Sequence, residues 1–231
     1  MKNIELLLNQ KELSRASEAY KSLRANVQFC GPDVHAIVVT SCMPNDGKST
    51  VSIGLGAALA EAGKTVLVVD ADLRKSTMIT TFSNEYGVVG FSEYLSGQAE
   101  LDEVKYTTQV SGLDVIFSGQ FPANPAELLS SSAFKAFIEE QKTLYNYIIV
   151  DTPPLGLVVD AAVVASVCDS AILVVPHSKI KLKTAKNVKA QLEKSGARII
   201  GVALNKWKRS GKRVGYYGKY RNGYYYKYYK Y

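Results

Sequence analysis

Short runs of apolar, mostly β-branched residues alternate with longer amphipathic segments along most of the chain. The runs predict strands, and the amphipathic segments, with apolar positions three or four residues apart, predict helices. The predicted strands cover residues 36–40, 65–70, 113–117, 147–151, 170–175 and 199–205. The predicted helices cover residues 10–29, 48–61 and 183–194, and one or two further helices are predicted over residues 126–144. Strands that are apolar on both faces and alternate with helices are typical of α/β proteins. We therefore expect a mostly parallel sheet with helices on both faces.

Three of the predicted strands end in a polar residue, which is Asp70, Asp151 or Asn205. In an open α/β sheet, ligands bind in the crevice at the carboxyl ends of the strands. The strand pattern therefore predicts that these three side chains lie near one binding site.

A P-loop sequence lies between the first predicted strand and the helix that follows it. Gly47-Lys48-Ser49 fits the end of the pattern GxxxxGK[ST], in which backbone N–H groups and the lysine bind phosphates and the hydroxyl reaches Mg²⁺. Cys42 stands where the pattern has its first glycine. The alternative is a helix N-terminus that carries these residues by chance. The strand and helix on either side favour ATP, and Asn205 is a candidate adenine contact. The expected ATP-binding residues are Met43, Pro44, Asn45, Asp46, Gly47, Lys48, Ser49, Thr50 and Asn205.

Acidic residues end two apolar strands, at Asp70 with Asp72 and at Asp151. A charge at the end of a buried run is costly unless it has a partner or a function. One such aspartate alone would suit a helix cap. Together with a P-loop, the pattern favours magnesium binding and catalysis, with Lys48 among the catalytic residues. We expect Asp151, with Ser49, to hold Mg²⁺, Asp70 to act as a general base, and Asp72 to support the metal or position the substrate. The sequence also allows these three roles to be exchanged among the three aspartates.

The net charge of +7 is concentrated at the C-terminus of the 231-residue chain. Residues 206–231 contain six lysines, three arginines and no acidic residue, so the rest of the chain is close to neutral. The length suits one α/β domain with appendages. We expect an N-terminal helical segment (1–32), a nucleotide-binding domain (33–206) and a basic tail (207–231).

Nine tyrosines lie in the tail among Gly, Lys, Arg and Asn, with no aliphatic residue after Val214. Such a segment cannot bury a core, so it is expected to be flexible and able to enter another active site. Basic residues mixed with aromatic ones also suit nucleic acid. The absence of Phe and Trp from residues 216–231 indicates a need for hydroxyl groups, and we expect phosphorylation and no nucleic-acid partner. The candidate phosphorylation sites are Tyr216, Tyr217, Tyr220, Tyr224, Tyr225, Tyr226, Tyr228, Tyr229 and Tyr231.

The N-terminal residues are amphipathic and lack the apolar region of a signal peptide. The most apolar stretch, residues 148–176, is interrupted by aspartates and prolines, which a membrane-spanning helix does not tolerate well. Three scattered cysteines without metal-ligand spacing favour a reducing compartment. We therefore expect a cytoplasmic protein that is attached to the membrane only through a partner or through surface charge.

Taken together, these motifs resemble those of the bacterial tyrosine kinases of capsule and exopolysaccharide synthesis, in their stand-alone cytoplasmic form. Residues 40–50 resemble the family's Walker A motif, residues 66–74 its Walker A′ motif and residues 147–154 its Walker B motif, and the tyrosine cluster is the most specific match. The family usually has Gly-Glu where this chain has Asn45-Asp46. Asn tolerates a positive φ better than most residues do, so we expect the loop to keep its conformation.

The resemblance implies an ATP-dependent tyrosine kinase with Mg²⁺ that phosphorylates tails mainly in trans, besides other protein substrates. It implies activation by a membrane adaptor of the polysaccharide chain-length type, which holds the protein at the membrane, and control of polymer export. Glu18, Lys21 and Arg24 resemble the helical motif through which family members assemble into rings. Lys21 replaces an arginine there and lacks the bidentate fork.

The main competing hypothesis is a MinD/ParA-like switch ATPase, which shares the fold and the acidic strand ends but has no kinase activity. The P-loop of that class has a second lysine five residues before the P-loop lysine. Met43 occupies this position. The sequence therefore favours the kinase.

Overall fold

An eight-stranded sheet forms the centre of the molecule, with the strand order β1-β4-β5-β3-β6-β2-β7-β8. The computed structural model describes residues 2–7, 10–83, 87–177 and 179–207. The strands are β1 (Lys2–Ile4), β2 (Ala36–Ser41), β3 (Val66–Asp70), β4 (Lys105–Thr108), β5 (Leu113–Ile116), β6 (Tyr147–Asp151), β7 (Ser170–Pro176) and β8 (Ile199–Asn205).

Six neighbouring strands are parallel, as the sequence predicts; in spatial order they are β5, β3, β6, β2, β7 and β8. At the other edge β4 runs antiparallel to β5, and β1 pairs parallel with β4. The apolar pattern did not predict β1, which forms the edge, or β4, which lies between β1 and β5. Their sequences are short and mixed in polarity, so their pairing depends on partners far along the chain.

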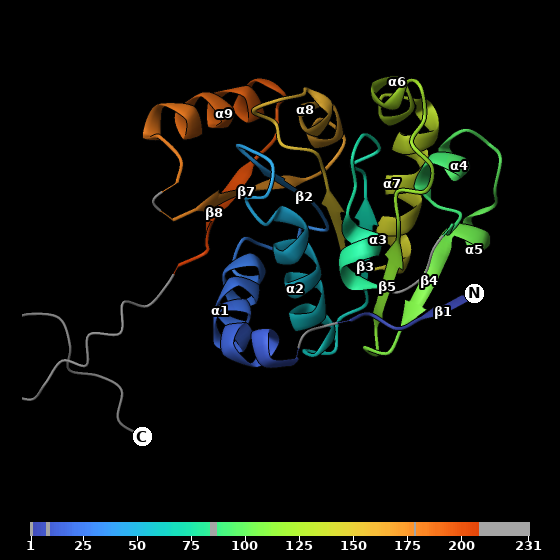
Figure 1. The fold of residues 1–231 in the computed structure, drawn as a ribbon, viewed down its shortest axis with the longest axis horizontal. Coiled ribbons are helices and arrows are strands. Elements are labelled where there is room, and N and C mark those ends of the chain that lie inside the picture. The colour runs from blue at the N-terminus through green and yellow to red at the C-terminus, as the bar shows by residue number, and fades with distance from the viewer. Residues whose placement is uncertain (1, 8–9, 84–86, 178, 208–231) are drawn as a thin grey trace, which may run out of the picture.

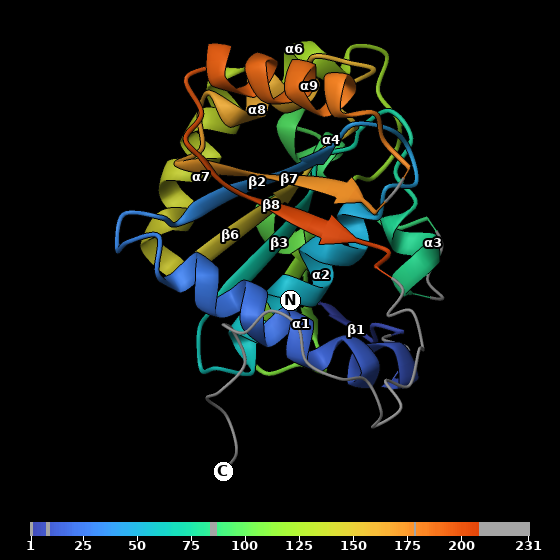
Figure 2. The same cartoon turned by 90° about the vertical axis from the view of Figure 1, so that its left-hand side faces the viewer.

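Helices cover both faces of the sheet (Figures 1 and 2). One apolar cluster joins the sheet to residues of α1, α2 and α3, and the other joins it to residues of α4 and α6–α9. The helices are α1 (Gln10–Gln28), α2 (Lys48–Ala60), α3 (Met78–Phe82), α4 (Phe91–Leu95), α5 (Leu101–Val104), α6 (Pro125–Leu129), α7 (Ser132–Leu144), α8 (Asp160–Ala165) and α9 (Leu182–Lys194). Of the one or two helices predicted over residues 126–144, the structure has two, α6 and α7, because Ser131 caps α7, its side chain accepting from the Phe134 N–H.

The first 32 residues, predicted as a helical segment, also contribute a strand to the main sheet through β1. α1 lies against α2, and Gly54 makes this close packing possible. A Cβ on Gly54 would lie 2.2 Å from the ring of Tyr20. The Tyr20 hydroxyl donates to the Thr50 carbonyl, 3.2 Å away in the first turn of α2. The N-terminal segment is therefore built onto the helix that follows the P-loop.

The parallel arrangement brings the polar strand ends together. β3 and β6 are neighbours, and Asp70 pairs in register with Asp151. Within the described part of the chain, no helix is long and apolar enough to cross a membrane. The tail tyrosines, residues 216–231, lie outside the described residues.

Phe91 lies at the centre of an aromatic cluster between α4 and α7, 4.9 Å from Phe137 and 6.0 Å from Phe134 between ring centroids. It is fully buried, so Phe91→Ala should lower the free energy of unfolding by about 3–5 kcal/mol. Urea denaturation followed by circular dichroism measures this change. Phe121→Ala, at a mostly exposed phenylalanine, is the matched control and should change stability by less than about 1 kcal/mol. Equal losses in the two variants would contradict the packing described for this cluster.

Candidate active site

The loop between β2 and α2 has the left-handed backbone that a phosphate-binding loop requires. Asn45 has φ 61° and Gly47 has φ 93°. Asp46 is buried, and its carboxylate accepts from the Met43 N–H at 2.8 Å, closing the turn. Asn45 therefore adopts the positive φ expected of it.

Cys42, in place of the first glycine, fits the loop without strain. It is fully buried and does not belong to the residues with positive φ, so the backbone accepts a side chain there. Its carbonyl lies against Gly156, where a Cβ would approach to 2.0 Å. Burial raises the pKa of the Cys42 thiol to about 11. Cys42 therefore has a structural role, and the loop conformation does not require a glycine at this position.

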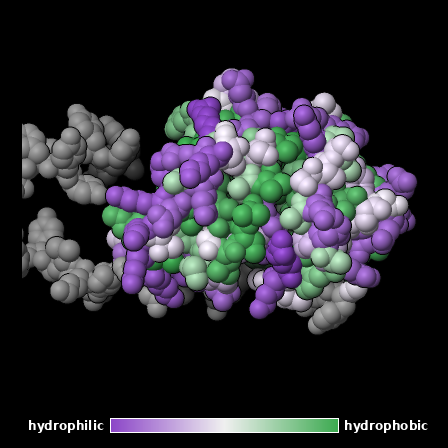
Figure 3. All heavy atoms as spheres, turned by 90° about the horizontal axis from the view of Figure 1, so that it is seen from above, coloured by the Kyte–Doolittle hydropathy of each residue, from purple (hydrophilic) through white to green (hydrophobic). Residues whose placement is uncertain are grey.

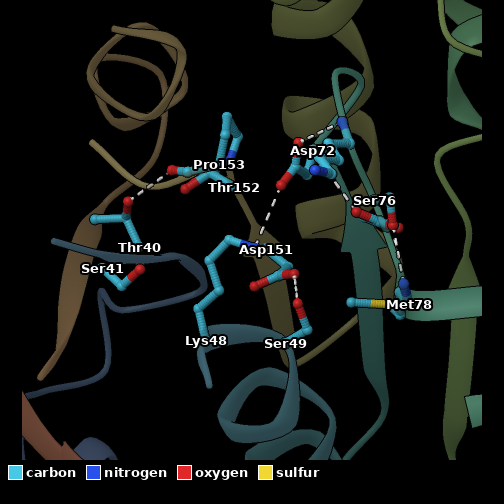
Figure 4. Close-up of polar contacts among 12 residues, drawn as sticks. Thr40, Ser41, Lys48, Ser49, Asp72, Ser76, Met78, Asp151, Thr152 and Pro153 are labelled. Carbon is cyan, nitrogen blue, oxygen red and sulfur yellow. Dashed lines mark hydrogen bonds and ion pairs between the residues drawn. The ribbon is translucent and has the colours of Figure 1, made fainter. Parts of the chain in front are cut away.

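Three carboxylates and one lysine meet at the ends of β3 and β6 (Figure 4). The Lys48 ammonium lies 3.3 Å from a carboxylate oxygen of Asp72. Asp70 is fully buried, and one of its oxygens accepts from the Asp72 N–H at 3.2 Å. Asp151 is almost fully buried beside it. The structure thus brings together the residues for which the sequence predicted catalysis.

Hydroxyl groups on neighbouring elements bind these carboxylates. Ser49 donates to one oxygen of Asp151 at 2.5 Å, and Ser52, one turn further along α2, donates to the other at 3.0 Å. The Ser76 hydroxyl donates to Asp70. Ser52 and Ser76 were not predicted. For Ser52, its position three residues after Ser49 on the same helix was an available signal.

Carboxyl groups outnumber cationic groups in this cluster. Burial raises the pKa of Asp70, and the charge of Asp151 raises it further. Burial also raises the pKa of Asp151, although Lys48 and the two serine hydroxyls act in the opposite direction. Burial opposes the charge on Lys48, but the carboxylates outweigh it and raise the pKa of the lysine. One cation therefore faces three acids, and a second cation would stabilise the site.

Mg²⁺ suits the donors present, which are a serine hydroxyl and carboxylate oxygens. Among the described residues, no group of three or more acidic, histidine or cysteine side chains forms a metal site by itself. Mg²⁺ does not need one, because it is commonly held by one or two carboxylates together with the phosphates of a nucleotide. Ser49, Asp72 and Asp151 are thus compatible with a nucleotide-dependent magnesium site.

Two pockets meet at Lys48. The first, of about 400 Å³, follows the P-loop and includes Lys48, Ser49, Thr50 and Asn205. Asn205 donates to the Asp46 carbonyl at 2.9 Å, so the end of β8 is tied to the loop. The second pocket, of about 320 Å³, includes Pro44 and Asn45 of the P-loop together with Lys48 and Asp72, and it reaches the segment before α8. Asp70 does not line either pocket, whereas Asp72 lines the second.

An ion pair that the sequence did not reveal fixes the segment after β3. The Arg74 guanidinium donates to both oxygens of Asp160, at 2.6 and 3.0 Å. Asp160 is 0% exposed at the start of α8. The two residues lie 86 positions apart, and an aspartate at a helix start looks like an ordinary cap in the sequence.

The residues of the predicted oligomerisation motif lie on α1, apart from the two pockets. Lys21 pairs with Glu18 at 2.8 Å within the helix, and both are largely exposed. Arg24 donates to the Ala58 carbonyl of α2 at 3.0 Å.

The parallel sheet, the P-loop and the acidic strand ends define a P-loop nucleotide-binding domain. A family model described as an AAA domain matches residues 35–195. Tyrosine-protein kinase CpsD of Streptococcus agalactiae is 40% identical over 91% of this chain and 92% of its own length. The kinase domain of the Escherichia coli tyrosine kinase ETK superposes with a TM-score of 0.80 at 34% identity, covering 90% of this chain and 80% of that one. The Mg-ADP complex of MinD from Pyrococcus horikoshii superposes with a TM-score of 0.63 at 27% identity, covering 77% of this chain and 72% of that one. The chain belongs to the family of bacterial tyrosine-protein kinases.

The backbone of Asn45 provides a test of the loop. A left-handed conformation costs an ordinary L-residue about 1–2 kcal/mol, so Asn45→Val should weaken binding of a fluorescent ATP analogue by about 5–30-fold. Asn45→Gly should bind within about twofold of the natural protein, because glycine accepts this φ. Titration of the analogue in Mg²⁺ buffer measures both affinities. If the two variants lose affinity equally, the side chain of Asn45 matters and not its backbone.

Proposed function

We propose that this kinase transfers the γ-phosphoryl group of ATP to the tyrosine cluster of its own tail, in trans, with Mg²⁺. The observation that carries the proposal is the meeting of two pockets at Lys48, beside buried carboxylates. One pocket suits the nucleotide and the other leaves room for an acceptor. The tail supplies acceptors in quantity, since it holds nine of the chain's 15 tyrosines.

The nucleotide lies in the pocket along the P-loop in this proposal. Backbone N–H groups of residues 43–50 and the start of α2 bind the phosphates, as at other helix N-termini. Asn205, which is tied to the loop through the Asp46 carbonyl, contacts the adenine base of the nucleotide. Ser49 and Asp151 hold Mg²⁺ in this proposal, which leaves Asp72 free to face the acceptor, and the ion would neutralise charge on the phosphate oxygens when it is bound.

The transfer itself is an in-line displacement. The phenolic oxygen of the acceptor forms a bond to the γ-phosphorus, the bond between this phosphorus and the bridging oxygen of ADP breaks, and a carboxylate takes the phenolic proton. Asp72 is our candidate for that carboxylate, because it lines the acceptor-side pocket and Asp70 does not. Asp70 holds Asp72 in place through the Asp72 N–H. Lys48 stabilises the charge that develops on the phosphoryl oxygens.

The cellular role that we propose is the regulation of capsule or exopolysaccharide synthesis and export, in the cytoplasm at the membrane through a chain-length-type adaptor. The CpsD relative supports it by similarity along nearly the whole chain. Assembly into a ring through residues 1–32 is part of the proposal. The Glu18–Lys21 pair is exposed and therefore available for exchange with another subunit, whereas Arg24 is engaged with α2. Residues 33–206 would be the kinase domain and 207–231 the substrate tail.

A switch ATPase without kinase activity is the alternative, and the structural similarity to MinD is what favours it. Met43, in place of that class's second lysine, counts against it. The two hypotheses differ in one product, phosphotyrosine.

A mixing experiment tests both transfer and direction. The Lys48→Met chain keeps its tail but loses the phosphate-binding ammonium, so alone it should form no phosphotyrosine with ATP and Mg²⁺ in the presence of the adaptor's cytoplasmic segment. A second chain, active but with all nine tail tyrosines changed to Phe, should then phosphorylate residues 216–231 of the Lys48→Met chain. Mass spectrometry identifies the modified residues, and Lys135→Met is the matched control that should stay active.

Two outcomes would contradict the proposal. ATP hydrolysis without phosphotyrosine in the natural protein would favour the switch ATPase. Phosphotyrosine that forms only when one chain carries both an intact Lys48 and its own tail would exclude transfer in trans.

A further inference from the structure

The acceptor-side pocket has two unlike walls. Asp72 and Lys75 from the segment after β3 form one, and Pro153, Pro154, Leu157 and Val158 from the segment after β6 form the other. Its volume of about 320 Å³ is at the small end of the range for ligand pockets, roughly 300–1,000 Å³. One side chain fits better than a folded segment would. The apolar wall suits the face of an aromatic ring, and Asp72 on the other wall supplies a carboxylate that can accept from a phenolic hydroxyl.

The apolar wall is held firmly although part of it is exposed. Leu155 is buried, and its N–H donates to the Ser41 carbonyl at 3.0 Å, which ties the segment to the end of β2. The Arg74–Asp160 pair fixes the start of α8 against the opposite wall. The distance between the two walls is therefore set by hydrogen bonds and an ion pair that do not involve a ligand.

Leu157 is 58% exposed at the rim of the pocket. Figure 3 looks down on α9, α8 and α6 and shows hydrophobic side chains gathered in the middle of this face, with hydrophilic ones around them. Exposed apolar groups that surround a pocket commonly mark a binding surface. Val159, two residues further on, is 65% exposed but does not line the pocket.

The rim also carries positive charge. The Lys75 side chain is exposed, and its ammonium forms no ion pair with any described residue. The guanidinium of Arg74 is neutralised by Asp160, so Lys75 supplies the free charge. Asp72 on the same wall attracts cations, but Lys75 at the rim repels the lysines and arginines of the unmodified tail, which has no acidic residue. Each phosphate adds about −1.5 to −2 charges and reverses the sign of this interaction.

From these features we propose, building on the kinase function above, that this pocket holds the acceptor tyrosine ring and selects tyrosines that have a phosphate or an acidic residue close by. Leu157 and Val158 pack on the ring, and Lys75 attracts the neighbouring negative charge. A tail that has received its first phosphate is then a better substrate than an unmodified tail. Phosphorylation of the cluster would accelerate after a slow first event.

The apolar wall can be tested with two neighbouring substitutions in the full chain. Leu157→Ser should raise KM for a synthetic peptide of residues 215–231 by about tenfold, with the affinity for an ATP analogue unchanged. Val159→Ser removes a comparably exposed apolar side chain that does not line the pocket, and it should leave KM within about twofold. Steady-state phosphorylation of the peptide measures both. Equal effects of the two variants would overturn the assignment of the pocket.

The charge preference is tested with two forms of that peptide, one unmodified and one carrying phosphate at Tyr224. The natural protein should add phosphate to the phosphopeptide several-fold faster, expressed as kcat/KM for the next transfer. Lys75→Glu should reverse this preference, and Lys135→Glu, an exposed lysine on α7, should preserve it. High salt should reduce the preference because it screens the interaction.

These outcomes separate the inference from the proposed function. If the natural protein phosphorylates neither peptide and no tail, the kinase proposal itself fails. If it phosphorylates both peptides equally well, or if Lys75→Glu leaves the preference unchanged, the selection by charge is wrong while tail phosphorylation stands.

Discussion

The interaction on which the rest of the site depends is the pairing of one lysine with three buried carboxylates. Asp70 and Asp151 lie side by side because β3 and β6 are parallel neighbours in register, and Lys48, in the first turn of α2, forms an ion pair with Asp72 and interacts electrostatically with the other two. Water is excluded from most of this cluster, so unbalanced charge is expensive there. The raised pKa values of Asp70 and Asp151 reduce this charge, because they favour the protonated carboxyl groups. Mg²⁺ and the polyphosphate of a nucleotide bind together and change the net charge of this cluster. The site is therefore adapted to the state in which both are bound.

The surrounding structure keeps these charges at fixed positions. Serine hydroxyls from α2 and from the segment after β3 bind the carboxylates, and Asp46 closes the P-loop turn. The Arg74–Asp160 pair joins the segment after β3 to α8 on the opposite side of the pocket. Both apolar layers of the sheet, with α2 on one face and α8 on the other, therefore contribute to the geometry around Lys48.

Much of this arrangement is readable from the sequence, and the exceptions have physical causes. Buried parallel strands are apolar on both faces, so all six could be located, and Asp70, Asp151 and Asn205 mark the edge at which they end. β1 and β4 were not predicted because short edge strands of mixed polarity acquire their conformation from a partner. Asp160 was missed because its ion pair spans 86 residues, and only the folded chain shows that Arg74 is its partner. The sequence likewise could not tell which of Asp70 and Asp72 faces an acceptor, because this depends on which of them lines the pocket in the folded chain.

The left-handed turn at Asn45, together with buried Cys42, has a consequence for recognising distant members of this family. A search pattern that demands glycine at the first position of the loop would pass over this chain. The requirement is on backbone angles: the positions of Asn45 and Gly47 must accept a positive φ, and Cys42 is not one of them. Scoring the loop by which residue types tolerate each torsion angle would retain sequences that a letter-based pattern discards.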